Sequence, residues 1–103
     1  MNILLSCSGG MSSSIIAQGL VDAAKKRGQT ITVDPTGTDS VADDLDNKNY
    51  DIVLLAPQSV YRKAAIEAEA KEHDKQFLMI PRTMYNPIQA SALLDLIEQS
   101  LHK

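Results

Sequence analysis

Short apolar segments alternate with segments of helical period along this chain, and that alternation constrains the fold more than any other feature. The apolar segments predict strands at Asn2–Ser6, Thr30–Val33, Asp51–Ala56 and Phe77–Ile80. The periodic segments predict helices at Ser12–Arg27, Ser40–Leu45, Gln58–His73 and Ile88–Leu101. Apolar strands separated by helices form parallel sheets that are covered on both faces. We therefore predict an α/β fold, a single doubly wound four-stranded parallel sheet of order 2-1-3-4 with helices on both faces.

Within each predicted helix, the spacing of apolar residues predicts the buried face. In the first helix this face holds Ile15, Ile16, Leu20, Val21 and Ala24. In the third helix it holds Val60, Tyr61, Ala64, Ala65 and Ala68. In the last helix it holds Ile88, Ala92, Leu93, Leu96, Ile97 and Leu101. The chain has 103 residues without a repeat, linker or low-complexity segment, so we expect one domain spanning 1–103.

The only cysteine, Cys7, follows the first predicted strand and opens a small polar loop. The loop residues are Ser8, Gly9, Gly10, Met11, Ser12 and Ser13. Ligands of doubly wound sheets bind beyond the carboxyl ends of the strands, which is where this loop is expected. Its glycines and the following helix N-terminus suit an anion bound by backbone N–H groups. A helix N-terminus also favours the thiolate form of a cysteine, so Cys7 is a candidate nucleophile for a phosphoryl group.

Other phosphate-binding chemistries do not fit the loop. A Walker loop requires a lysine after its glycines, and the dinucleotide fingerprint requires glycines that are not adjacent. A cysteine phosphatase requires an arginine where Ser13 stands, and one cysteine excludes a Cys-x-x-Cys redox motif. The remaining interpretation is a carrier, which accepts a phosphoryl group, protects it and transfers it to an acceptor. The alternative from the residues alone is that Cys7 is a small buried hydrophobe without chemistry.

Composition narrows the class of function further. A formal net charge of −3 and only three Tyr, one Phe and no Trp disfavour nucleic acid as a partner. The chain shows no signal-peptide pattern and no apolar run near the ~20 residues that span a bilayer. With its single cysteine, this pattern predicts a cytoplasmic protein. His73 and His102 stand in polar helix-end sequences, and the aspartates from Asp39 to Asp46 lack calcium-loop spacing. We therefore expect no metal and no cofactor.

Two motifs carry a resemblance to a known family. The loop CSGGMSSS, from Cys7 to Ser14, and the segment LLAPQSVY, from Leu54 to Tyr61, resemble the enzyme IIB components of the sugar phosphotransferase system, lactose/cellobiose class. The resemblance implies that Cys7 is phosphorylated and that the backbone from Ser8 to Ser13 cradles the phosphate. It also implies that Pro57, Gln58 and Tyr61 lie at the same edge of the sheet, as candidate contacts of a second loop.

The same resemblance implies the partners. A phosphohistidine on enzyme IIA would donate the phosphoryl group to Cys7. The acceptor would be a sugar bound by the membrane-embedded enzyme IIC, a β-glucoside or disaccharide such as cellobiose, chitobiose or lactose. This chain would then not insert into the membrane but associate with its inner face through enzyme IIC. The sugar itself does not follow from the sequence.

Several residues near the motifs have open roles at this stage. Gln58 is a candidate to donate to phosphate or to cap its helix, while Tyr61 is expected in the core with its hydroxyl at the surface. Arg82 is the one cation expected on a loop at the active edge, as a solvated side chain. Asn86 stands where the family has glycine and is expected to keep the turn with a positive φ, and a role for Tyr85 is left open. The alternatives in function are a low-molecular-weight cysteine phosphatase or arsenate-reductase-like enzyme, and a non-catalytic anion- or protein-binding domain.

Overall fold

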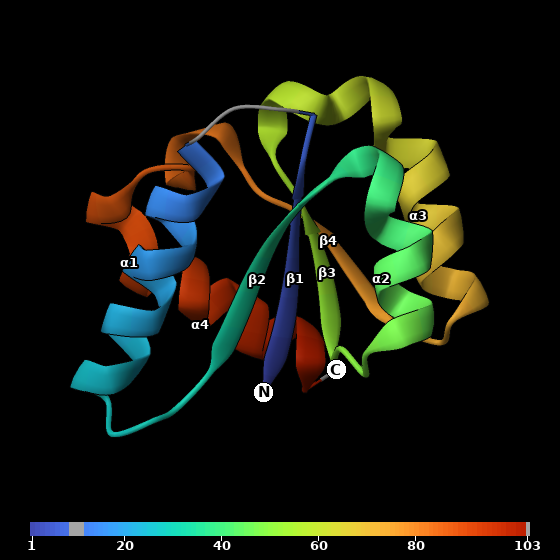
Figure 1. Cartoon of the computed structure of the whole chain (residues 1–103). Helices are drawn as coiled ribbons and strands as arrows, with labels where there is room; N and C mark the ends of the chain where they lie inside the picture. The colour runs from blue at the N-terminus through green and yellow to red at the C-terminus, as the bar shows by residue number, and fades with distance from the viewer. Residues whose placement is uncertain (9–11, 103) are drawn as a thin grey trace.

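A computed structural model of the chain describes residues 1–8 and 12–102, and its centre is a parallel sheet (Figure 1). The strands are β1 Asn2–Cys7, β2 Thr32–Gly37, β3 Ile52–Leu55 and β4 Gln76–Met79. They lie in the order β2-β1-β3-β4, and every neighbouring pair is parallel. The predicted sheet and its order are confirmed, with β1 and β3 as the inner strands.

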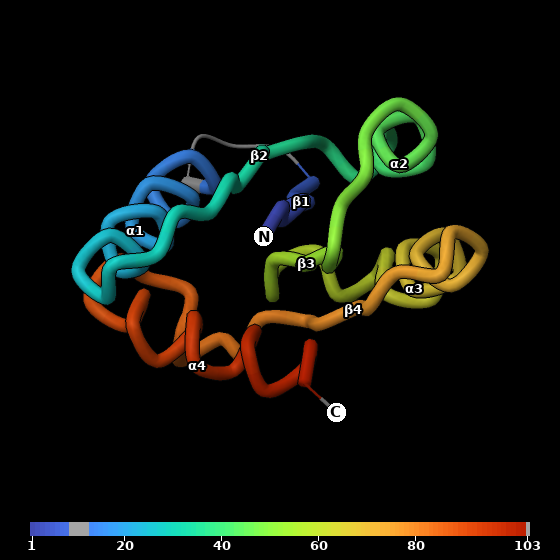
Figure 2. Tube along the Cα trace, turned by 90° about the horizontal axis from the view of Figure 1, so that it is seen from below, coloured from blue at the N-terminus to red at the C-terminus, as the bar shows by residue number. Residues whose placement is uncertain are grey.

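Helices follow each strand. The α-helices are α1 Ser12–Lys26, α2 Val41–Asn47, α3 Lys63–Glu72 and α4 Ala90–Leu101. Short 3₁₀ helices lie between them, namely η1 Thr38–Ser40, η2 Pro57–Arg62, η3 Arg82–Met84 and η4 Pro87–Gln89. Helices α1 and α4 cover one face of the sheet, and α2 and α3 cover the other, as Figures 1 and 2 show. The predicted cover on both faces is therefore confirmed.

The inner strands supply side chains to two separate cores. Because successive residues of a strand point to opposite faces, Ile3 and Leu5 pack on the α1 and α4 side, while Leu4 packs on the α2 and α3 side. Strand β3 divides in the same way, with Leu54 in the first core and Val53 in the second. A strand buried on both faces is apolar at nearly every position, which explains the apolar segments of the sequence; the buried Ser6 of β1 donates its hydroxyl hydrogen to the Leu54 carbonyl at 2.7 Å.

The bounds of strand β2 differ from those that we predicted. We expected the strand at Thr30–Val33, with Asp34 and Pro35 ending it, but it runs from Thr32 to Gly37 and pairs Pro35 with Leu5 of β1. Strand β2 is at the edge of the sheet. Proline lacks the N–H that an inner strand needs for pairing on both sides, but an edge strand has one unpaired side and tolerates it.

Three predicted helix faces are also corrected. The segment from Pro57 begins as a 3₁₀ helix, whose three residues per turn place different side chains inward than an α-helix does. As a result Val60 and Tyr61 are exposed, whereas Ile66 and Ala70 form the buried face. On the other side of the sheet, Ile15 and Ile88 were expected in the core and are 58% and 90% exposed. Ile88 lies in η4, before α4 begins, so it does not continue the buried stripe of that helix.

The turn at Asn86 differs from expectation as well. Asn86 has a φ of −158°, which is extended backbone, so the expected positive φ is wrong. Its side chain instead accepts a hydrogen bond from the N–H of Gln89 at 3.0 Å and caps η4. Asparagine serves in this turn as a capping acceptor, which is its common role at the start of a helix.

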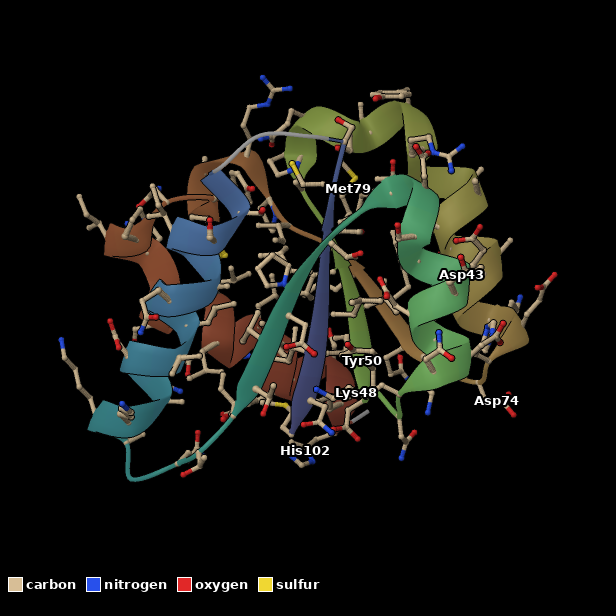
Figure 3. The ribbon with its side chains drawn as sticks, viewed as in Figure 1. Asp43, Lys48, Tyr50, Asp74, Met79 and His102 are labelled. Atoms are coloured by element: carbon tan, nitrogen blue, oxygen red, sulfur yellow. The ribbon has the colours of Figure 1, made fainter. Side chains whose placement is uncertain are left out.

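A polar network ties the outer strand β2 to the rest of the fold. The Asp34 carboxylate accepts hydrogen bonds from Lys48 Nζ at 2.8 Å and from the Tyr50 hydroxyl at 2.7 Å. The hydrogen bond from Lys48 is the main cause that lowers the pKa of Asp34, and burial together with Asp34 raises that of Tyr50. Figure 3 shows Lys48 and Tyr50 near the amino ends of the strands, with Met79 near the carboxyl ends. Asp34 itself pairs with Leu4, three residues before Cys7 on β1.

Candidate functional site

Cys7 is the last residue of β1, at the carboxyl edge of the sheet. Strand β1 lies between β2 and β3; Cys7 pairs with Gly37 of β2, whereas the pairing with β3 ends one residue earlier, at Ser6. Its side chain is 2% exposed. Helix α1 begins at Ser12, on the far side of the loop that follows Cys7. Cys7 therefore stands at the edge of the sheet where the sequence analysis expected the chemistry.

Only part of the predicted phosphate cradle belongs to the described residues. Gly9, Gly10 and Met11 lie outside them, as does the side chain of Ser12. Ser8 is exposed, and Ser13 is buried in the first turn of α1. The cradle as a whole stays a prediction from the sequence.

The turn from Ala56 to Ser59 holds both neighbours of Cys7. On one side, the carbonyl oxygen of Ser6 accepts a hydrogen bond from the Ala56 N–H at 2.9 Å. On the other side, the Ser8 N–H donates to Ser59 Oγ at 2.9 Å, and the Ser59 hydroxyl donates to Ser8 Oγ at 2.8 Å. The Ser59 N–H in turn donates to the Ala56 carbonyl at 3.0 Å. The cysteine is thus bracketed by hydrogen bonds to a single turn.

Ser59 is the site residue that the sequence analysis missed. It is completely buried, although it follows the exposed Gln58 and precedes the exposed Val60. The sequence did contain an indication of this contact. A small residue with a hydroxyl group stands two positions after Pro57, within the segment LLAPQSVY. Periodicity assigned that position to a helix, whereas Ser59 has non-helical φ and ψ of −102° and 24°.

The predicted residues of the second loop have different environments. Pro57 is buried at the start of η2, and Gln58 is exposed on the same turn. The residue that caps η2 is Ala56, without a side-chain hydrogen bond, so Gln58 does not cap this helix. Tyr61 is 73% exposed, and its expected place in the core is wrong. The second loop therefore presents Gln58 and Tyr61 outward and buries Pro57.

Two arginines lie on segments that leave the carboxyl ends of the strands. Arg82 is exposed in η3, after β4, as expected of a solvated side chain. Arg62 ends η2, after β3, and the sequence analysis had placed it within a long helix. Its Nε is buried, and no hydrogen-bond partner for it is found among the described residues. Arg82 is consequently not the only cation on this side of the molecule.

The histidines belong to other parts of the molecule. His73 is partly buried at the end of α3, and its Nε2 lies 2.7 Å from Asp46 Oδ1, joining the end of α3 to α2. His102 follows α4 near the amino ends of the strands (Figure 3). There, a hollow of about 670 Å³ is lined by residues that include Met1, Thr30, Asp51 and Glu98. Within residues 1–8 and 12–102, no cluster of His, Cys, Asp and Glu is arranged to hold a metal ion.

Exposed apolar side chains lie on three of the segments that connect the strands of the sheet. In the described part of the chain, the large hydrophobic residues that are exposed are Ile15, Val60, Tyr61 and Ile88. We call these four residues the apolar rim. They come from α1, η2 and η4, the segments that follow β1, β3 and β4. Ile15 and Pro87, the neighbour of Ile88, line one shallow hollow of about 410 Å³ on the outer side of α1.

Residues 2–95 match the family described as the lactose/cellobiose-specific IIB subunit of the PTS system. The chain belongs to this family. The PTS system oligo-beta-mannoside-specific EIIB component of Bacillus subtilis (strain 168) is 30% identical over 83 residues, which are 81% of this chain and 79% of that protein. Membership gives the chain a role in phosphoryl transfer coupled to sugar uptake, in concert with other components of that system.

Solved structures support the fold. The lactose-specific IIB component domain from Streptococcus pneumoniae superposes with a TM-score of 0.84 at 18% identity, covering 97% of this chain and 96% of that one. The cellobiose-specific IIB component from Borrelia burgdorferi has a TM-score of 0.77 at 29% identity, covering 99% of this chain and 92% of that one.

Among the described residues of this IIB chain, no helix has the length and apolar character needed to cross a bilayer.

Proposed function

We propose that this IIB chain is a phosphocarrier that holds the phosphoryl group on Cys7. Its thiolate attacks the phosphorus of a phosphohistidine on enzyme IIA. The S–P bond forms as the N–P bond breaks, and the imidazole nitrogen keeps the electron pair of that bond. In the second step, a hydroxyl oxygen of a sugar bound by enzyme IIC attacks the same phosphorus, and sulfur leaves as thiolate once more. The hydroxyl proton passes to a base of the acceptor complex.

The observation that carries this proposal is the position of Cys7. It ends an inner strand at the carboxyl edge of a doubly wound sheet, directly before the loop that leads into α1. That edge is where such sheets bind their ligands, and the N-terminus of α1 attracts negative charge. We assign the phosphate cradle to the backbone of the loop from Ser8 to Ser13, in line with the family motif, with the N–H of Ser8 itself bonded to Ser59. Transfer of this kind depends chiefly on positioning and on electrostatic stabilisation.

The apolar rim supports the docking part of the proposal. A carrier meets two partners in turn, so each encounter must be brief and must use a surface next to Cys7. Transient interfaces bury a modest area with apolar contacts near their centre. The rim supplies such contacts on both sides of the cysteine, with Ile15 in the first turn of α1 and Tyr61 in η2. We assign the rim, with Gln58 beside it, to contact with enzyme IIA and then with enzyme IIC.

One observation fits the non-catalytic alternative as well as the carrier. Cys7 is 2% exposed, which is the environment of a structural thiol as well as of a shielded nucleophile. Family membership favours the carrier over this alternative, and over the phosphatase and arsenate-reductase alternatives.

We place the protein in the cytoplasm, at the inner face of the membrane through enzyme IIC. Its sugar is in the class of β-glucosides and related disaccharides, such as cellobiose, chitobiose or lactose.

Intact mass spectrometry tests the carrier directly. The chain is incubated with phosphoenolpyruvate, the general phosphotransferase proteins and an enzyme IIA of the lactose/cellobiose class. The wild type should gain the mass of one phosphoryl group, and Cys7→Ser should gain none while keeping its circular dichroism spectrum. Gain of a phosphoryl group by Cys7→Ser would show that Cys7 is not the acceptor. Turnover of para-nitrophenyl phosphate by the wild type would indicate a phosphatase instead of a carrier.

A further inference from the structure

We propose that Ser59 is a positioning residue for phosphoryl transfer, which it serves by fixing Ser8, the residue directly after the nucleophile. This proposal rests on the proposed function, since it concerns the rate at which Cys7 takes up a phosphoryl group. The paired hydrogen bonds between Ser59 and Ser8 are its basis.

The Ser59 hydroxyl both accepts a hydrogen bond from Ser8 and donates one to it. Its oxygen accepts from the Ser8 N–H at 2.9 Å, and its own hydrogen goes to Ser8 Oγ at 2.8 Å. Ser59 is fully buried, where a hydroxyl without partners would carry a desolvation penalty. Both of its hydrogen-bonding functions are engaged by one residue, so the contact fixes the backbone of Ser8 and its side chain together.

The turn that carries Ser59 is itself anchored to the sheet. The Ser59 N–H donates to the Ala56 carbonyl at 3.0 Å, and the Ala56 N–H donates to the Ser6 carbonyl at 2.9 Å. Ser6 precedes Cys7 and Ser8 follows it, so the same turn holds the backbone on both sides of the cysteine. Alignment of sulfur with phosphorus depends on this backbone, and small misplacements of a nucleophile are costly in rate.

The contact also determines which backbone groups are left for the phosphate. The Ser8 N–H is the first N–H after Cys7, and it is already bonded to Ser59. Ser59 thereby fixes the first residue after β1. A side chain of the same shape without a hydroxyl would fill the space and leave the Ser8 N–H without this acceptor.

The matched variants are Ser59→Thr and Ser59→Val, which have nearly the same shape and differ in the hydroxyl group. Any steric strain in this buried position is therefore common to both. Ser6→Ala is the control, because Ser6 is also fully buried and its hydroxyl donates to the Leu54 carbonyl at 2.7 Å, without contact to Ser8. It removes one buried serine hydroxyl from the same strand end and leaves the pair of Ser59 and Ser8 intact.

The assay follows phosphoryl uptake from a phosphorylated enzyme IIA of the lactose/cellobiose class by rapid quench and intact mass. Its readouts are the maximal single-turnover rate and the half-saturating concentration of the donor. We expect Ser59→Val to lower the maximal rate about tenfold, equivalent to about 1.4 kcal/mol of activation free energy, with the half-saturating concentration unchanged. Ser59→Thr and Ser6→Ala should keep the maximal rate of the wild type to within about threefold.

Amide hydrogen exchange at Ser8 gives an independent reading without any donor. It should be slow in the wild type and in Ser59→Thr, and fast in Ser59→Val. Equal maximal rates for the Thr and Val variants, or equal exchange at Ser8, would overturn the proposal while the carrier function stood. Absence of phosphoryl uptake by the wild type would instead overturn the carrier function, and this proposal with it.

Discussion

Tyr61 offers the sharpest test of the docking surface, because it is 73% exposed in a protein whose other two tyrosines are buried or partly buried. Exposed tyrosines are frequent centres of binding energy at protein interfaces. We expect Tyr61→Ala to weaken docking of phosphorylated enzyme IIA, seen as a higher half-saturating concentration of the donor. The maximal transfer rate should be unchanged, since Tyr61 has no part in aligning Cys7.

The size of the effect follows from the exposed area. A tyrosine buries about 150 Å² or more when it is covered, so its 73% exposure leaves about 110 Å² available. A transient interface that covers half of this area removes about 55 Å² from water. At about 25 cal/mol per Å², this is worth about 1.4 kcal/mol, or about a tenfold change in the half-saturating concentration.

Two variants make the result interpretable. Tyr61→Phe keeps the ring and loses the hydroxyl, so it should behave as the wild type if the contact is apolar. Gln29→Ala changes an exposed residue before β2, at the opposite edge of the sheet, and should have no effect. Because Tyr61 is exposed, Tyr61→Ala should leave the melting temperature nearly unchanged. A half-saturating concentration equal to that of the wild type would refute the assignment of the rim to docking.

Two further predictions concern stability. The hydrogen bond to Asp46 raises the pKa of His73, so its stabilisation is complete at low pH and is lost as the pH rises through the raised pKa. The wild type should melt above His73→Gln at about pH 5 and together with it at about pH 9; a gap that persists at the higher pH would contradict this. Gly28 has a φ of +73° and open space around its Cα, so Gly28→Ala should cost about 1 kcal/mol in urea unfolding through backbone strain alone. An unchanged urea midpoint would count against that cause.

The sequence predicted the sheet well because its strands are defined by burial. An inner strand such as β3 contacts a core on each face, and this double burial requires the unbroken apolar run that the sequence shows. The outer strand β2 carries no such pattern beyond Val33, since it alternates buried and exposed residues and includes Pro35. Its end at Gly37 is set by pairing with β1, which is a property of the folded sheet.

The faces of the helices were predicted less well, and the error lay near the site. Helical periodicity assumes a constant 3.6 residues per turn, but η2 is a 3₁₀ helix with a kink at Ser59. When a 3₁₀ segment is assigned with the period of an α-helix, the error in the predicted face grows with each successive residue. This is why Tyr61 was expected inside and Ser59 was not expected as a contact of the loop after Cys7. Cys7 itself was located correctly because its position depends only on the end of β1.

The strand order explains why a residue after β3 meets the residue after Cys7. In the order β2-β1-β3-β4, the chain leaves β1 for α1 on one face of the sheet, and leaves β3 for η2 and then α3 on the opposite face (Figure 1). Between these diverging connections, the carboxyl ends of β1 and β3 remain adjacent, with Ser6 paired to Leu55. Any side chain that reaches the backbone of Ser8 from the β3 side must therefore come from the first residues after that strand. Ser59 is the residue there that is both buried and able to accept a hydrogen bond from an N–H and donate one of its own. The topology thus determines which segment lies beside the residue after Cys7, and the Ser59 hydroxyl bonds both the N–H and the Oγ of that residue.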